Sequence, residues 1–129
     1  MVKGLEISHD KFDLARAIME GVAFETSMVL DIFKSCGINI KSLMMSGGAA
    51  KSRIWSEIAG YATGCDIYRT SDADVCPIGG AVLAAVGCGL FKSYKECSGI
   101  IGGSEKLPLS DASMYDYYAE KKAGYLKNM

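Results

Sequence analysis

The sequence predicts an α/β fold in which two short parallel strands are flanked by helices. Apolar residues recur at helical spacing over residues 10–36, and two strand-like runs, residues 40–45 and 65–69, are each followed by a helical segment. Strands that alternate with helices pair in parallel through right-handed crossovers. The chain has 129 residues, which is enough for one domain and no more.

The long helix over residues 10–36 is the first strong element. Its apolar side chains repeat at spacings of three, four or their multiples, which gives it one apolar face. That face is formed by Leu14, Ile18, Val22, Val29 and Phe33. Asp10 is placed to cap its start, and Gly37 follows its end, where a left-handed residue is favoured.

The remaining elements are shorter. In chain order we expect a strand over residues 40–45, a turn over 46–50, a helix over 51–63, a strand over 65–69, a polar loop over 70–74 and helical segments over 77–86, 93–97 and 110–126. Two strands make a poor sheet, because independent stability usually needs three or more strands or good cover by helices. We therefore expect part of a domain whose opening strands are missing.

Residues 75–91 form the longest stretch without a charged side chain. The stretch contains Pro77 and four glycines, and it is shorter than the roughly 20 apolar residues of a membrane-spanning helix. We interpret it as a helix buried in a protein core and expect no membrane partner.

The charges and the cysteines narrow the class of function. Lys plus Arg number 14 and Asp plus Glu 15, and this near-balance argues against nucleic acid as the main partner. Five cysteines without CxxC spacing and a single histidine, His9, give no pattern for a zinc cluster. Lys3 and Glu6 interrupt any early apolar run, so we expect no signal peptide and predict free thiols in a reducing cytoplasm.

Residues 46–52, with the sequence SGGAAKS, join the first strand to the next helix. Paired glycines let the backbone approach a ligand with no side chain in the way, and a following helix points free N–H groups at the turn. The pattern favours a phosphate or the ribose-phosphate part of a nucleotide, and a tight turn without a ligand is the alternative. Lys51 is no Walker lysine, because GAAKS shares only the ending of a P-loop and does not match G-x-x-x-x-G-K-[ST]. No G-x-G-x-x-G supports a Rossmann site.

Three segments resemble signatures of the FGGY carbohydrate kinases. DLARAIMEGVAFE at residues 13–25 resembles the second family signature, MSGGAAKSRIWSEIAGYATG at 45–64 the adenosine motif, and CPIGGAVLAAVGCGLFKS at 76–93 a third block. Gly4 and Leu5 also fit the second signature. We expect this chain to begin inside that signature. The adenosine motif departs from the family at Ala49, where a third glycine is usual.

The resemblance, which is xylulokinase-like, implies a partial ribonuclease-H-like (actin-like ATPase) domain. Residues 1–129 would be the carboxy-terminal part of the second kinase domain, on its nucleotide-binding side. The whole enzyme would transfer the γ-phosphate of ATP to a sugar hydroxyl, with a pentulose such as xylulose as the acceptor. Gly47, Gly48 and Ala49 would lie along the α-phosphate and the ribose, and Ser52 near the adenine.

The resemblance also implies what this chain lacks. The phosphate loops, the Mg²⁺-binding carboxylate, the catalytic Asp and most sugar contacts belong to family segments with no match here. We therefore expect no catalytic residue and no metal ligand in this chain, and no activity from it alone. Exposed strand edges and apolar helix surface predict that it forms a homo-oligomer.

Other side chains have both a functional and a structural interpretation, and the structural one is favoured for each. Glu20 and Glu25 are either a catalytic pair or, as their five-residue spacing favours, one packed and one solvated carboxylate. Trp55 either stacks on a base or packs in the core. Asp72 and Asp74 form either a metal pair or a solvated loop.

His9 and the carboxy-terminal tyrosines are expected to be structural. We predict that His9 is a surface or capping residue, and that four tyrosines dock the last helix: Tyr115, Tyr117, Tyr118 and Tyr125. The alternative function, from another class, is a non-catalytic nucleotide-binding or interaction module. An upstream reading frame that encodes the first kinase domain would favour the kinase.

Overall fold

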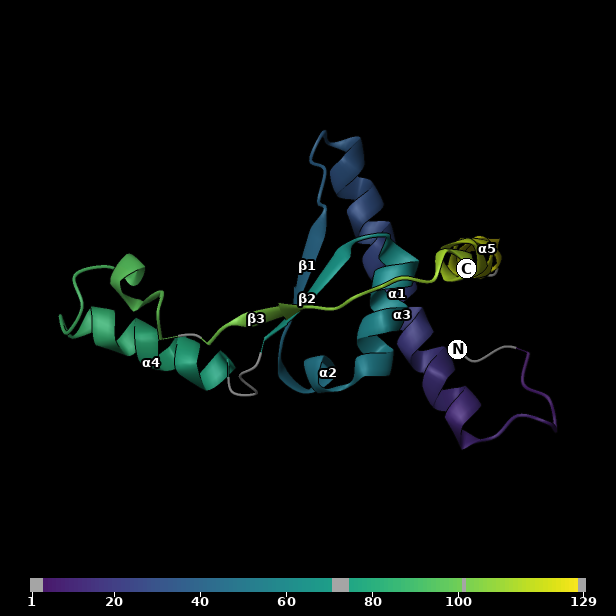
Figure 1. The fold of residues 1–129 in the computed structure, drawn as a ribbon, viewed down its shortest axis with the longest axis horizontal. Coiled ribbons are helices and arrows are strands. Elements are labelled where there is room, and N and C mark those ends of the chain that lie inside the picture. Colours follow the sequence, from purple (N-terminus) through teal and green to yellow (C-terminus); the bar gives the residue numbers. More distant parts are fainter. Residues whose placement is uncertain (1–3, 71–74, 101, 128–129) are drawn as a thin grey trace. The chain divides into compact units, whose positions relative to one another are not determined.

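The structure, a computed structural model, describes residues 4–70, 75–100 and 102–127 (Figure 1). The chain divides into two compact units. The helical unit comprises Met1–Ile40, Ile58–Gly64 and Ser110–Met129, and the sheet unit comprises Lys41–Glu57 and Cys65–Leu109.

The helical unit begins with α1, which spans Lys11–Ser35. Asp10 caps this helix by accepting hydrogen bonds from the backbone N–H groups of Phe12 and Asp13 at 2.7 and 3.1 Å. The Asp13 carboxylate in turn accepts one from the Asp10 N–H at 3.0 Å. This reciprocal capping box satisfies donors that have no partner within the helix. With Gly37 at φ 82° after the helix, both predicted ends are confirmed.

The core of the helical unit lies between α1, α5 (Ala112–Lys127) and the second half of α3 (Arg53–Thr63). Its buried members are Ala23, Phe24, Ile58, Ala62 and Tyr118. The Phe24 ring centre lies 5.4 Å from that of Tyr125 and 6.3 Å from that of Tyr118. These contacts confirm that tyrosines dock the last helix.

The predicted apolar stripe of α1 is not the face that packs in this core. Its members expose between 39% and 58% of their surface: Leu14, Ile18, Val22, Val29 and Phe33. The buried residues of α1 are instead Glu20, Ala23, Phe24 and Ser27. The prediction that α1 exposes apolar surface is confirmed.

The sheet unit contains three strands in the order β1-β2-β3. β1 (Ser42–Met45) and β2 (Asp66–Thr70) are parallel, with Leu43 opposite Ile67 and Met45 opposite Arg69. β3 (Ser104–Lys106) is antiparallel to β2. The parallel pair confirms the prediction from the sequence, whereas the expected two-stranded sheet is wrong by one strand.

β3 escapes sequence-based prediction because its residues, Ser104, Glu105 and Lys106, have neither apolar alternation nor β propensity. Its structure comes from tertiary contacts with β2. Lys106 Nζ lies 2.7 Å from Asp66 Oδ2, and the N–H of the next residue, Leu107, donates to the Ile67 carbonyl at 2.8 Å. Leu107 and Ile67 are both buried.

The helix expected over residues 51–63 begins at residue 53, and the turn expected over residues 46–50 is wrong because most of it is helical. α2 spans Gly47–Lys51 and α3 spans Arg53–Thr63. Ser52 separates them because its backbone is extended, at φ −90° and ψ 110°. The glycine pair therefore lies inside the first turn of α2, and not in a loop before the helix.

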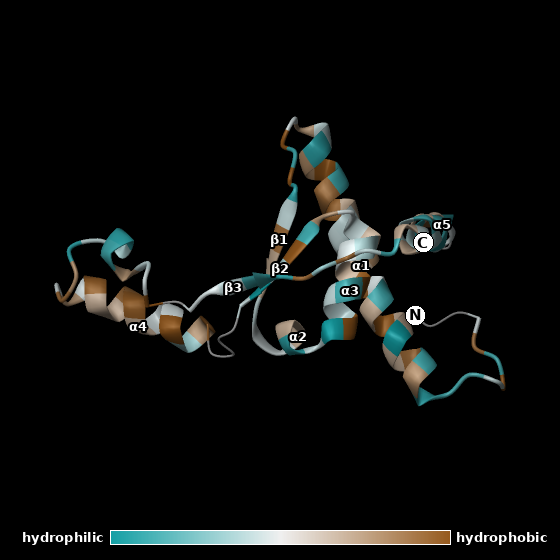
Figure 2. Ribbon diagram, viewed as in Figure 1, coloured by the Kyte–Doolittle hydropathy of each residue, from teal (hydrophilic) through white to brown (hydrophobic). Residues whose placement is uncertain are grey.

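The expectation that residues 77–86 form a core helix is only half right. α4 spans Val75–Gly87, but none of its residues is buried, and Leu83 exposes 60% of its surface. Figure 2 shows apolar residues on several sides of this helix, while its main packing partner among the described elements is the short helix η1 (Tyr94–Cys97). No helix in the described part of the chain is both long and apolar enough to span a membrane.

Candidate functional site

The turn predicted to meet a nucleotide follows β1 directly. Ser46 has extended backbone, and Gly47 then adopts φ 67°, a left-handed conformation that residues with a Cβ rarely take. A glycine is therefore required at residue 47 by the backbone itself.

The backbone conformation does not require a glycine at residue 48. The φ of Gly48 is not left-handed, and a Cβ built on it meets no atom within 4 Å. Gly48 is exposed, whereas Ala49 is half-buried and Ala50 is buried. The backbone at Gly48 is therefore open to contact from outside the turn, as it is at the other glycines where an added Cβ meets no atom within 4 Å.

Ser52 ends α2 and starts α3. Its Oγ accepts a hydrogen bond from the Trp55 N–H at 3.3 Å, and its carbonyl accepts from the Ser56 N–H and hydroxyl at 3.1 and 3.0 Å. A serine hydroxyl used as an acceptor keeps its own O–H for donation. The Ser52 hydroxyl therefore retains a donor for a ligand such as a purine base.

The structural interpretation holds for Glu20, Glu25 and His9. Glu20 is buried and Glu25 is exposed, where its carboxylate accepts from the Tyr125 hydroxyl at 2.7 Å. His9 is exposed and accepts from the Glu6 N–H at 2.9 Å. Trp55 is half-buried, so its stacking role stays untested.

Two candidate metal ligands predicted from the sequence cannot be placed in the structure. Asp72 and Asp74 lie outside the described residues. Within the described ranges no three His, Cys, Asp or Glu side chains are grouped so that they could hold a metal ion.

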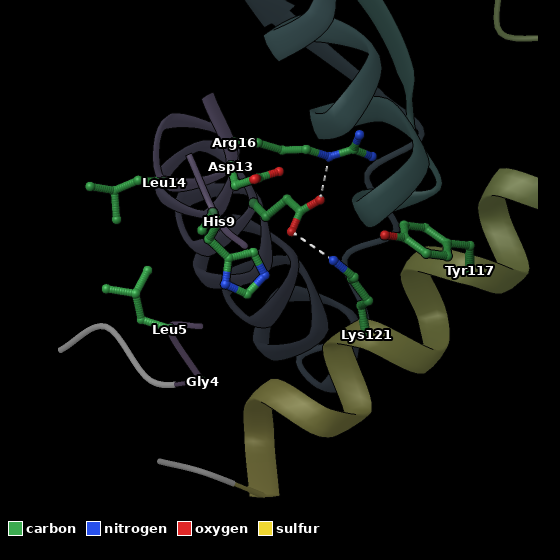
Figure 3. Close-up of a pocket in the computed structure, with 10 residues that line it drawn as sticks. Gly4, Leu5, His9, Asp13, Leu14, Arg16, Tyr117 and Lys121 are labelled. Atoms are coloured by element: carbon green, nitrogen blue, oxygen red, sulfur yellow. Dashed lines mark hydrogen bonds and ion pairs between the residues drawn. The ribbon is translucent and has the colours of Figure 1, made fainter. Parts of the chain in front are cut away.

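The helical unit has a cavity of about 350 Å³ of its own, drawn in Figure 3. Leu5, His9, Asp13, Arg16 and Lys121 are among its lining residues, and none of the four predicted nucleotide-site residues lines it. Its floor is the buried carboxylate of Glu20. Arg16 Nε and Lys121 Nζ lie 2.9 and 3.2 Å from the two Glu20 oxygens, along the dashed lines in Figure 3.

Tyr118 completes this cluster. Its hydroxyl donates to Glu20 at 3.2 Å and accepts from Arg16 Nη2 at 3.1 Å. The hydrogen bond to Glu20 is the main reason that the pKa of Arg16 is raised, and burial raises the pKa of the Tyr118 hydroxyl. The charges of the cluster thus satisfy one another, as expected of a structural network that ties α5 to α1.

No sequence motif singles out Arg69, which the sheet brings opposite Met45 beside the turn. Its Nε is buried and has no hydrogen-bond partner among residues 4–70, 75–100 and 102–127. Arg69 stands out only once the register of the two strands is known, and a sequence pattern does not determine that register.

Residues 1–88 match the family model described as the FGGY family of carbohydrate kinases, C-terminal domain. The chain belongs to this family. The FGGY chain is 33% identical over 94 residues to a xylulose kinase of Staphylococcus epidermidis and 33% identical over 101 residues to a glycerol kinase of Saccharolobus islandicus. These matches cover 73% and 78% of this chain but only 19% and 20% of the relatives.

Solved structures agree with this assignment. The xylulose kinase of Rhodospirillum rubrum matches with a TM-score of 0.75 at 22% identity, over 97% of this chain and 25% of the other. The glycerol kinase of Plasmodium falciparum matches with a TM-score of 0.66 at 18% identity, over 98% and 26%. The predicted actin-like ATPase fold is thereby confirmed, and the FGGY chain spans about a quarter of these enzymes.

Proposed function

We propose that this FGGY chain forms the adenosine-binding wall of an ATP-dependent sugar kinase, within the carboxy-terminal part of its second domain. The observation that carries the proposal is the turn at Gly47 and Gly48, which lies within the matched family range and has open space over its backbone. Gly47, Gly48 and Ala49 lie along the α-phosphate and ribose in this proposal, and the Ser52 hydroxyl lies near the adenine. The glycerol kinase of similar fold from P. falciparum was solved with ADP, which supports it.

The acceptor in this proposal is a pentulose such as xylulose, because xylulose kinases are among the most similar relatives and structures. The γ-phosphate is transferred to a sugar hydroxyl with Mg²⁺ held by residues outside this chain. Five free cysteines, three of them exposed, support a reducing cytoplasm as its location.

Calorimetric titration of the chain with ADP tests nucleotide binding, and a coupled assay of ADP release with ketoses and polyols tests activity. We expect saturable ADP binding and no sugar-dependent turnover, because phosphoryl transfer needs all parts of the cleft together. Sugar-stimulated ATP consumption by the homogeneous chain would show that it carries a catalytic centre of its own. ADP binding without a kinase domain encoded in the same gene would favour the alternative, a non-catalytic nucleotide-binding module.

We also propose that the chain self-associates through β1. The two outer strands of the sheet differ, because β3 carries Glu105 and Lys106 whereas β1 contains no charge or proline. Charged side chains protect a sheet edge from pairing, and a neutral edge invites it. In an antiparallel pairing about a two-fold axis at Met44, which is 58% exposed, no two like charges face each other.

Sedimentation equilibrium at ~100 µM tests this association. We expect a dimer or larger species, and Met44→Lys should shift it towards monomer because two lysines would then face each other. Ser104→Lys, on the opposite edge, is the matched control and should leave the association unchanged. A well-folded monomeric wild-type chain would contradict the proposal.

A further inference from the structure

Arg69 lies where the two parallel strands end together. It is the fourth residue of β2 (Asp66–Thr70) and pairs with Met45, the last residue of β1. Neighbouring strands are about 4.8 Å apart, and Met45 is followed at once by Ser46 and Gly47. The register therefore places a permanently charged residue beside the turn of the proposed nucleotide site.

The side chain of Arg69 is largely held inside the sheet unit. Side chains alternate between the two faces of a strand, so Arg69 shares a face with Ile67, which has no exposed surface. Arg69 itself exposes 22% of its side chain, and α2 packs against β2. The guanidinium is consequently removed from most of the water that would otherwise solvate it.

The hydrogen-bonding capacity of Arg69 is not used up within the described residues. Its buried Nε lacks any partner. Its ion pair is to Glu105, whose carboxylate is 3.7 Å from Nη2 and 77% exposed, too far for a hydrogen bond. Buried donors are nearly always paired, because an unpaired one loses its hydrogen bonds to water without replacing them. In contrast to the Glu20 cluster, this cation lacks a compensating network.

We propose that the guanidinium of Arg69 binds a phosphate oxygen of the nucleotide held at Gly47 and Gly48. The inference rests on the proposed function and extends it by one specific residue. A phosphate oxygen supplies both the negative charge and the acceptor that Nε lacks, and Arg is suited to such a group because its donors form a planar fork. Arg69 thus makes the site prefer nucleotides with a phosphate chain over the nucleoside.

The test compares the affinities of ADP and adenosine for the chain and its variants by calorimetry. We expect Arg69→Gln to weaken ADP binding at least tenfold and to change adenosine binding by less than twofold. The ADP affinity of Arg69→Lys should lie between those of the wild-type chain and Arg69→Gln, because lysine keeps the charge but loses the planar fork of donors. Unchanged adenosine affinity, with an unchanged circular dichroism spectrum, shows that the variant is folded.

Glu105→Gln is the control that separates a ligand role from a structural one. It removes the ion-pair partner of Arg69, so it should mimic Arg69→Gln if the arginine acts only by holding β3 on β2. If Arg69 binds phosphate, Glu105→Gln should leave ADP binding unchanged or make it slightly tighter. Equal ADP affinity of the wild-type chain and Arg69→Gln would overturn the inference alone, whereas failure of the wild-type chain to bind ADP would overturn the proposed function with it.

Discussion

The Glu20 cluster and Arg69 are both partly buried charges, and they differ in how their partners are supplied. Glu20 is 6% exposed and has three donors, from Arg16, Tyr118 and Lys121. Among the described residues, Arg69 has one long contact to an exposed carboxylate, and its buried Nε has no partner. A charge whose partners all come from its own fold is a structural device, and a charge left without one points to a ligand.

Glu20→Gln is expected to give the largest effect, because it breaks the satisfied network. The amide keeps the size of the carboxylate but loses its charge, and its NH₂ group turns a donor towards either Arg16 or Lys121. Hydrogen bonds to charged groups contribute about 1.5–3 kcal/mol each, and Arg16 and Lys121 are 48% and 41% exposed, so water offsets part of the loss. We expect a fall of about 2 kcal/mol in the free energy of unfolding, measured with urea.

Glu25→Gln is the matched control on the same helix. Glu25 is exposed and accepts one hydrogen bond from Tyr125, so the substitution should change stability by less than about 0.5 kcal/mol. Equal effects of the two substitutions would mean that the buried network contributes nothing beyond an exposed pair.

Gly48→Val tests the proposed ligand site beside Arg69, because the new side chain fills the space over the turn. A branched side chain would occupy the surface where the backbone meets the nucleotide, so we expect ADP affinity to fall at least tenfold, or about 1.4 kcal/mol. In a longer kinase that contains this chain, the KM for ATP should rise far more than the KM for the sugar.

Gly79→Val is the control for that substitution. Gly79 is also helical, belongs to the same unit and has nothing within 4 Å of an added Cβ. It should therefore carry the same helix-propensity cost and leave ADP binding unchanged. A loss of sugar affinity with intact ATP affinity in Gly48→Val would show that the turn does not bind the nucleotide.

Raising the pH into the alkaline range should lower the free energy of unfolding through the Glu20 cluster, by less than Glu20→Gln does. Burial raises the pKa of Tyr118 above its ordinary value of 10.0, so the folded state holds this proton more tightly than the unfolded state. The corresponding stability is complete below that value and is lost as the pH rises through the folded pKa. The pKa of Lys121 is also raised, because contacts with Tyr117 and Glu20 outweigh burial, and it acts in the same direction.

Tyr118→Phe isolates the contribution of the hydroxyl. Urea unfolding at about pH 8 and about pH 11 should show a larger loss of stability for the wild-type chain than for the variant, while Lys121 titrates in both. Parallel losses in the two proteins would mean that the Tyr118 proton is not linked to folding.

Local rules determined much of this protein from its sequence. The cap at Asp10, the left-handed Gly37 and the strand that leads into SGGAAKS depend on residues within a few positions of one another. The same short segments carried the family resemblance, which the comparisons confirmed. Caps and turns are predictable because their hydrogen bonds and backbone angles depend only on residues close in sequence.

Tertiary structure alone decided the features whose partners are distant in sequence. β3 became a strand because β2, some 36 residues earlier, offered an edge and two charge partners. Glu20 was buried because α5 brought Tyr118 and Lys121 to it, although an apolar stripe lay on another face of α1. Arg69 came to lie opposite Met45, at the start of the turn, only through the parallel register of β1 and β2. Such pairings depend on the summed free energy of many contacts across the fold, and no short stretch of sequence contains that sum.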